Sequence, residues 1–217
     1  PGDGLAEPRL RVPVAAEGWS FILPPAAAAC IMAWMGWWAA ATVFGVVALA
    51  FLGFFRDPER TAPSLPGAVL APADGRVMVV TEAVDPWVGP AVRVSIFLSP
   101  LDVHVNRAPI GGLVKNVEYV AGRFLAAYRP EASEQNERCA MGVEGERARV
   151  TVTQISGVLA RRIVCRARPG DTLRAGERYG LIRFGSRTDL TLPRETELRV
   201  RVGDRVRGGE SVMGVLG

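Results

Sequence analysis

Residues 170–177 have the sequence Gly-Asp-Thr-Leu-Arg-Ala-Gly-Glu, and residues 203–210 have the sequence Gly-Asp-Arg-Val-Arg-Gly-Gly-Glu. Both copies share the frame Gly-Asp-x-apolar-Arg-x-Gly-Glu, which predicts a turn, a short strand and a second turn. Two copies are too few for a solenoid. They favour a small, pseudo-symmetric β-barrel or β-sandwich.

More strands are expected between residue 56 and the first copy of this repeat. Residues 69–80 are typical of a strand, a turn at Asp74-Gly75 and a second strand. Further strand candidates, several with alternating apolar and polar residues, are 92–97, 114–120, 149–155 and 161–166. Because no long segment here has a helical period, we expect a mainly β domain over residues 56–217.

The repeat resembles the hammerhead-like turns of biotinyl and lipoyl carrier domains, which have the barrel-sandwich-hybrid fold. We therefore expect a barrel-sandwich-hybrid-like β domain. Those carriers attach their prosthetic group to a lysine at a hairpin tip between the two halves. Since the only lysine of this chain is Lys115, outside the repeat, a prosthetic-group carrier is disfavoured.

An uncharged segment precedes the β domain. Residues 18–55 contain no charged side chain, and the segment is nearly twice the roughly 20 residues that one spanning helix needs. Tryptophans interrupt its middle and arginines flank both ends, which predicts a helical hairpin whose two ends are cytoplasmic. The residues concerned are Trp34, Trp37 and Trp38 in the middle, and Arg9, Arg11, Arg56 and Arg60 at the ends. We predict an N-terminal lead over 1–17 and a membrane-associated hairpin over 18–55. A re-entrant hairpin, or one core helix of a soluble protein, is the alternative.

The composition limits the remaining classes of function. A net charge of +4, carried mostly by arginine beside an apolar segment, favours anionic phospholipid over nucleic acid as the partner. Three cysteines without CxxC spacing predict no disulfide framework and no zinc site, and favour a reducing compartment. His104 is the sole histidine, which excludes multi-histidine metal centres.

The Gly185-Ser186 pair carries the chemistry that sets this chain apart. A serine hydroxyl can attack the carbonyl of a preceding unhindered glycine, pass through an ester and eliminate. The chain is then cut, and the new N-terminus becomes a pyruvoyl group. Since Gly-Ser is also a very common loop dipeptide, the pair needs support from other segments.

Two other segments give that support. Residues 71–75, Ala-Pro-Ala-Asp-Gly, present the Asp74 carboxylate at a tight turn, and residues 102–107, Asp-Val-His-Val-Asn-Arg, present His104. With the hydrophobic hairpin, the Phe-Arg-Asp-Pro-Glu-Arg run at 55–60 and the C-terminal Gly-Ser, the whole chain resembles the short class of phosphatidylserine decarboxylase proenzymes.

This resemblance implies a pyruvoyl-dependent enzyme, without metal or pyridoxal phosphate, that converts phosphatidylserine to phosphatidylethanolamine. It implies self-cleavage between Gly185 and Ser186 into a large chain, 1–185, and a small chain, 186–217. The two chains would form a heterodimer, with further dimerisation left open, at the cytoplasmic face of the cell membrane. No nucleic-acid partner is expected.

The resemblance also implies roles for single residues. Ser186 becomes the pyruvoyl group and condenses with the substrate amine as a Schiff base. His104 matches the histidine of the decarboxylation cycle, and Asp74 matches the aspartate that supports self-cleavage. Arg107 stands where longer members have a second histidine, the base of an Asp-His-Ser triad. Because an arginine is not a credible general base, we expect Arg107, with Asn106, to bind substrate. The base for self-cleavage is left open between His104, Asp74 with water, and strain at the bond.

The sequence is compatible with three alternatives. A decarboxylase of another serine phospholipid, such as an ether lipid, or of a soluble amino acid would use the same chemistry, although the hairpin favours a lipid. A membrane-anchored barrel-sandwich adaptor would carry long coiled-coil heptads between its half-motifs, which this sequence lacks. An enzyme that uses pyridoxal phosphate would depend on Lys115, which lies in a strand-like run.

Overall fold

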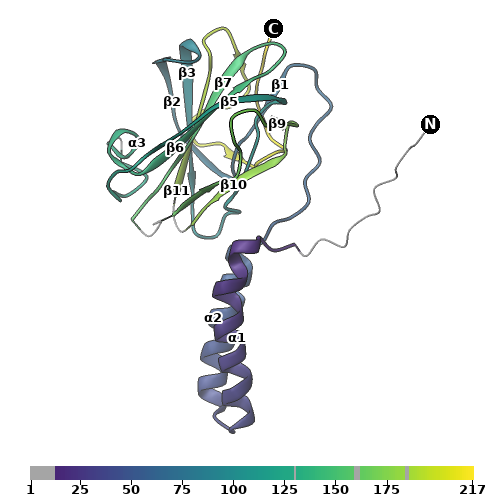
Figure 1. Ribbon diagram of the computed structural model, residues 1–217, viewed down its shortest axis with the longest axis vertical. Helices are drawn as coiled ribbons and strands as arrows, with labels where there is room; N and C mark the ends of the chain where they lie inside the picture. The colour runs from purple at the N-terminus through teal and green to yellow at the C-terminus, as the bar shows by residue number, and fades with distance from the viewer. Residues whose placement is uncertain (1–12, 130, 159–161, 184–185) are drawn as a thin grey trace, which may run out of the picture. The chain divides into compact units, whose positions relative to one another are not determined.

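The computed structural model describes residues 13–129, 131–158, 162–183 and 186–217. The chain forms two compact units, which divide between Glu59 and Arg60. Figure 1 shows a pair of helices in the N-terminal unit and antiparallel strands in the C-terminal unit.

The N-terminal unit is a helical hairpin. A 3-10 turn, Ala16–Gly18, leads into α1, Trp19–Trp34, and α2 follows as Trp38–Phe54. Gly36, whose φ is 78°, lies in the turn between the helices, where a left-handed conformation favours glycine. Figure 1 shows the two helices side by side, and the Phe21 ring packs 5.6 Å from that of Phe51. The predicted helical hairpin is confirmed.

The surface of this hairpin is apolar. Trp34, Trp38 and Leu49 are 88%, 70% and 66% exposed, and other large apolar side chains of both helices are exposed as well. By length and composition alone, the helix Ala16–Trp34 could cross a membrane, with a mean hydropathy of 1.2. The helix Trp38–Phe54 is apolar but shorter. Arg9 and Arg11, which were predicted to flank the hairpin, lie outside the described residues.

The C-terminal unit is built from antiparallel strands. Among the described residues these form an eight-stranded sheet in the order β13-β2-β3-β11-β7-β6-β5-β9 and two three-stranded sheets, β1-β14-β12 and β4-β10-β8. The strands are β1 Ala68–Leu70, β2 Gly75–Asp85, β3 Gly89–Leu98, β4 Val105–Arg107, β5 Gly112–Val120, β6 Arg138–Glu144, β7 Arg149–Ile155, β8 Ile163–Cys165, β9 Thr172–Leu173, β10 Arg178–Ile182, β11 Ser186–Pro193, β12 Glu197–Leu198, β13 Arg205–Val206 and β14 Val212–Val215. One short helix, α3 Ala132–Gln135, precedes β6. The predicted mainly β fold is confirmed.

The core lies on the inner face of the large sheet. Successive side chains of a strand alternate between its two faces, so Val94, Val152 and Leu190 from three neighbouring strands meet there. Each of these side chains is fully buried. β11 lies between β3 and β7 and is therefore a central strand of this sheet.

The internal repeat has the predicted turn–strand–turn conformation in both copies. Gly170 and Gly203 have φ values of 97° and 99°, and the short strands that follow are β9 and β13. The Asp171 carboxylate accepts a hydrogen bond from the Arg168 amide at 2.8 Å, and the Asp204 carboxylate accepts one from the Arg201 amide at 2.9 Å. The two copies thus close their first turns with the same bond.

The second turns of the two copies lie against each other. Gly176 and Gly209 both have a φ of 78°. The Gly176 amide donates to Ala108 O and the Gly209 amide donates to Ala71 O, each at 2.8 Å. A β-carbon on Gly176 would lie 3.6 Å from Gly209 O, an ordinary van der Waals distance, so the two turns are neighbours.

Glycine at the start of β2 is required by a close backbone approach. Gly75 has a φ of 153°, and a β-carbon there would lie 2.1 Å from Phe97 O.

We predict that Gly75→Ala lowers the free energy of unfolding by about 2–5 kcal/mol, because the backbones of β2 and β3 must separate. Gly89→Ala is the matched control in the same hairpin: its φ is 90° but nothing lies within 4 Å of the added methyl group. It should cost only about 1–2 kcal/mol. Urea denaturation followed by circular dichroism compares the two, and equal losses would contradict the packing argument.

Candidate functional site

Ser186 is the first residue of β11, opposite Leu98 of β3. Its side chain is fully buried, and Oγ has no hydrogen-bond partner among the described residues. A buried hydroxyl without a partner is unfavourable, so such groups often have a chemical rather than a structural function. Gly185, the other half of the predicted cleavage site, lies outside the described residues.

His104 lies in the connection between β3 and β4 and is fully buried. Its Nδ1 is 2.9 Å from Asp102 O. Since a carbonyl oxygen only accepts, Nδ1 must carry a hydrogen, which leaves Nε2 as the ring nitrogen that can gain or lose a proton. The backbone also ties His104 to the end of β10, because the Ile182 amide donates to His104 O at 3.2 Å. His104 therefore lies beside the end of β10, and Ile182 precedes Ser186 by four residues in the chain.

A buried amide network joins the small β4-β10-β8 sheet to the large sheet next to Ser186. Asn106 Nδ2 donates to Thr188 Oγ1 at 3.2 Å, and Gln154 Nε2 donates to Asn106 Oδ1 at 2.9 Å. All three side chains are fully buried. Thr188 follows Ser186 by two residues, so the two side chains share one face of β11. Asn106 was predicted to bind substrate. Its Nδ2 and Oδ1 atoms both take part in the hydrogen bonds that join the two sheets.

Ser156 is a neighbour of Ser186 that the sequence did not reveal. Ile155 pairs with Arg187 in the β7–β11 ladder, so the next residue, Ser156, is opposite Ser186. Ser156 is fully buried, and its Oγ likewise has no partner among the described residues. The register thus puts two buried hydroxyls next to each other. The available signal was a polar residue directly after the strand predicted over 149–155.

Asp74 lies in the turn before β2, and both carboxylate oxygens accept hydrogen bonds. The Gly208 amide donates to Oδ1 at 2.8 Å, and Arg60 Nη2 donates to Oδ2 at 2.9 Å. Arg60 also pairs with Glu210 at 2.9 Å. The sheet order puts β3 between β2 and β11, so Asp74 and Ser186 are separated by about 10 Å, two strand spacings. The ion pair that holds Asp74 was not predicted.

Arg107 lies against the second turns of the repeat. Its side chain is buried, and Nη1 donates to Gly176 O at 3.1 Å. A β-carbon on Gly209 would lie 2.7 Å from Arg107 Cδ, so the stem of the arginine fills the space that this glycine leaves. Arg107 and Asn106 are consecutive residues of β4, and their side chains therefore point to opposite faces. Arg107 belongs to the same turn cluster as Asp74.

The Cys139 thiol is not a competing nucleophile beside this site. Cys139 lies on β6 directly opposite Gln154. A side-chain hydrogen bond with Cys165, together with burial, raises the pKa of the Cys139 thiol well above its usual range. The thiol is therefore protonated at neutral pH and a poor nucleophile. Among the described residues, no group of three or more His, Cys, Asp and Glu side chains is placed to hold a metal ion.

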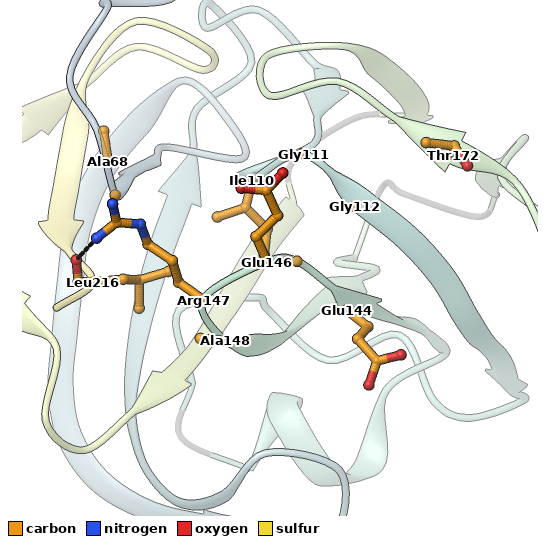
Figure 2. Close-up of a pocket in the computed structure, with 12 residues that line it drawn as sticks. Ala68, Ile110, Gly111, Gly112, Glu144, Glu146, Arg147, Ala148, Thr172 and Leu216 are labelled. Atoms are coloured by element: carbon orange, nitrogen blue, oxygen red, sulfur yellow. Dashed lines mark hydrogen bonds between the residues drawn. The ribbon is translucent and has the colours of Figure 1, made fainter.

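A cavity of about 450 Å³ lies at the other end of the large sheet. Figure 2 shows residues of its lining, which include Glu144, Glu146 and Arg147 of the β6–β7 hairpin together with Gly111 and Gly112. This hairpin lies at the start of β7, whereas Ser186 lies beyond its end, so roughly 20 Å of strand separates the cavity from Ser186. The cavity contains none of the predicted site residues.

Comparison with known proteins gives one consistent result. The family model described as phosphatidylserine decarboxylase matches residues 47–214. The phosphatidylserine decarboxylase proenzyme of Symbiobacterium thermophilum is 48% identical over 206 residues, which cover 94% of this chain and 95% of the relative. The proenzyme of the same name from Nitrosomonas europaea is 45% identical over 202 residues, covering 92% of this chain and 94% of the relative. That from Oleidesulfovibrio alaskensis is 46% identical over 199 residues, covering 91% of each.

Proposed function

The chain belongs to the phosphatidylserine decarboxylase family, and we propose that it acts as a carboxy-lyase that converts phosphatidylserine to phosphatidylethanolamine. The observation that carries the proposal is the family match over most of the chain. The buried hydroxyl of Ser186, at the start of a central strand, supports it. The His104 and Asp74 segments lie toward the same end of that sheet.

We propose that Ser186 first cuts the chain. Its Oγ attacks the Gly185 carbonyl carbon, and the Gly185–Ser186 amide becomes an ester as the nitrogen takes up the hydroxyl proton. Loss of the Ser186 α-proton then expels the Gly185 carboxylate as the new C-terminus of the large chain. Water replaces the nitrogen, ammonia leaves, and the small chain begins with a pyruvoyl group. A buried hydroxyl without a structural hydrogen bond suits this sequence, because the attack breaks no existing bond.

The surroundings of Ser186 fit the group that would form from it. The pyruvoyl carbonyl supplies an electron sink for the carbanion left when CO₂ departs. Leu98 on one side of Ser186 excludes water, and Ser156 on the other can donate a hydrogen bond. A buried, water-poor position also strengthens the electrostatic interactions of a charged substrate group.

We propose that His104 holds and delivers the proton of the decarboxylation cycle at Nε2. The bond from Nδ1 to Asp102 O supports this, because it fixes the ring orientation and leaves Nε2 as the atom that exchanges a proton. Asp74 is proposed to support self-cleavage through the turn that its ion pair with Arg60 stabilises. That Arg107 and Asn106 contact the anionic headgroup of the lipid remains a prediction.

The strand order supports a heterodimer that persists after cleavage. The small chain, 186–217, would contribute β11 between β3 and β7, β13 beside β2, and β14 beside β1. These ladders join it to residues of the large chain along most of its length. We propose that the two chains therefore stay together without a covalent bond.

We propose that the helical unit anchors the enzyme at the cytoplasmic face of the cell membrane. Exposed apolar side chains along both helices are what a lipid environment requires, since water would not solvate them favourably. Arg56 and Arg60 follow α2, in agreement with a cytoplasmic end of the hairpin. The lipid substrate would then be present in the membrane to which the enzyme is bound.

Self-processing is tested by intact mass. The purified protein should contain a fragment that begins at position 186 and carries a keto group in place of an amine, and Ser186→Ala should give one full-length chain without activity. Thr196→Val is the matched control, because Thr196 also has a buried hydroxyl without a partner among the described residues, but beyond the far end of β11. It should be cleaved normally. A wild-type protein that stays intact and still decarboxylates lipid contradicts the pyruvoyl proposal.

The roles of His104 and Arg107 are separated by running each variant on a gel before any assay. His104→Ala should be cleaved and bind lipid but lose about 10²–10⁴-fold in kcat, the usual contribution of a proton-transfer group. Arg107→Ala should also be cleaved, and its KM should rise about ten- to a hundredfold, since a hydrogen bond to a charged group contributes about 1.5–3 kcal/mol. Arg107→Lys should recover only part of the loss, because lysine lacks the planar fork. An uncleaved Arg107→Ala protein would show that this residue acts in maturation.

Membrane attachment is tested by flotation with vesicles that contain anionic phospholipid. The full-length chain should float with the vesicles even at high salt, because burial of apolar side chains is not screened by ions. A chain that lacks residues 1–59 should stay in the lower fraction, and circular dichroism should show that its β unit is folded. Full-length protein that remains in the supernatant without detergent would contradict the anchor.

A further inference from the structure

A buried ion pair lies directly after the proposed cleavage bond. Arg187 Nε donates to Asp189 Oδ1 at 2.6 Å, and Nη2 donates to Asp189 Oδ2 at 3.1 Å. The two side chains are only 3% and 4% exposed. Because they alternate with Ser186 and Thr188 along β11, they lie on the opposite face of the strand. This pair takes no part in the chemistry proposed above.

The ion pair is bonded to residues that precede the cleavage bond. Arg187 Nη2 donates to Ser95 Oγ of β3 at 2.6 Å, and Ser133 Oγ of α3 donates to Asp189 Oδ2 at 3.3 Å. After cleavage, Arg187 and Asp189 would belong to the small chain, while Ser95 and Ser133 would belong to the large chain. The four side chains then form a polar contact between the two chains.

Stability alone does not account for charged residues at these positions. Two apolar side chains of similar volume are often as stabilising as a buried ion pair, because the charges must be removed from water. The register neighbours of Arg187 are Phe97 and Ile155, which would pack well against an apolar side chain. What the ion pair adds is direction: the bidentate contact and the Ser95 bond fix the guanidinium in one orientation.

We propose that Arg187, Asp189, Ser95 and Ser133 form a clamp that holds the new end of the small chain in register after self-cleavage. Before the cut, Ser186 is held by the chain on both sides. After the cut it is a strand end, and chain ends fray unless they are tied down. The clamp holds the residue next to Ser186, so the group formed from Ser186 keeps the position at which substrate is decarboxylated. This inference rests on the proposed self-cleavage.

The proposed clamp predicts that its loss affects cleavage and turnover differently. Cleavage occurs in the continuous chain, so loss of the clamp should leave cleavage intact. Turnover occurs with the free strand end, so it should slow. Because a displacement of about 1 Å at a reacting group can cost about 10²-fold in rate, we expect kcat to fall about a hundredfold while KM changes little.

The test uses the double variant Arg187→Met/Asp189→Leu, which removes both charges together and leaves neither buried alone. It is purified as the full-length chain and compared with wild type in four measurements: cleavage on a gel, reaction of the keto group with a hydrazide probe, kcat and KM on phosphatidylserine in detergent micelles, and hydrogen exchange at residues 186–190. Arg194→Gln is the matched control, because it breaks an exposed 2.7 Å pair with Glu82 beyond the other end of β11. Wild-type behaviour is expected of the control.

We expect the double variant to be cleaved completely and to react with the hydrazide, but to exchange faster at its new end and turn over about a hundredfold more slowly. Arg187→Lys keeps the positive charge without the planar guanidinium and should have an intermediate turnover rate. It replaces the double variant in the test if the double variant does not fold. Wild-type turnover in a cleaved variant would overturn the clamp, and so would a folded variant that is not cleaved. If wild type itself is not cleaved, the proposed self-processing fails, which is a different outcome.

Discussion

The hydrogen-bonded position of β11 between β3 and β7 is the constraint on which the rest of the site depends. Ser186 pairs with Leu98 on one side, and the ladder from Arg187 to Thr191 pairs with β7 on the other. From Arg187 onward the strand is bonded on both sides, so after the proposed cut only its first residue would need the clamp to stay in register. Both of its faces are buried as well, so a slip by one residue would carry charged side chains into the core. The geometry at Ser186 is therefore set by the sheet rather than by a loop.

The buried polar groups around this strand define how the small sheet meets the large one. Unpaired amides would each cost about 1–3 kcal/mol, so Asn106 and Gln154 must stay in contact for the β4-β10-β8 sheet to pack here. That packing also determines where His104 lies, because His104 immediately precedes β4 and its carbonyl accepts the Ile182 amide. A polar corner of this kind permits one arrangement of the two sheets, whereas apolar contacts would tolerate several. Ser186 and Ser156, whose hydroxyls have no partner among the described residues, lie beside this network.

The local patterns of the sequence predicted the helical hairpin, the strands around Asp74-Gly75 and the repeated turns, because each depends on residues close together in the chain. The hairpin turns at Gly36, within the tryptophan cluster that indicated a break. The segment Ser186–Pro193 could not be recognised as a central strand, because Arg187 and Asp189 at alternating positions are typical of a solvent-exposed face. Their burial depends on Ser95 and Ser133, which are distant in the chain. Gln154 and Ser156 were missed for the same reason, since only the register of β7 and β11 brings them to Ser186.

The internal repeat explains how the segments of the predicted site, which are far apart in the sequence, are linked in the fold. The second turn of each copy bonds to an Ala-Pro segment: Gly209 to Ala71, and Gly176 to Ala108. These two segments are linked to each other, because the Arg107 amide donates to Pro72 O. Asp74 follows one segment and the His104 loop precedes the other. In a carrier domain the same turns would support a lysine-bearing hairpin. Here they position the Asp74 and His104 segments against the large sheet, whose strand β11 begins at Ser186. The same turns bind Asp74 through the Gly208 amide, so the pseudo-symmetry that predicted the fold also contributes a contact to the site.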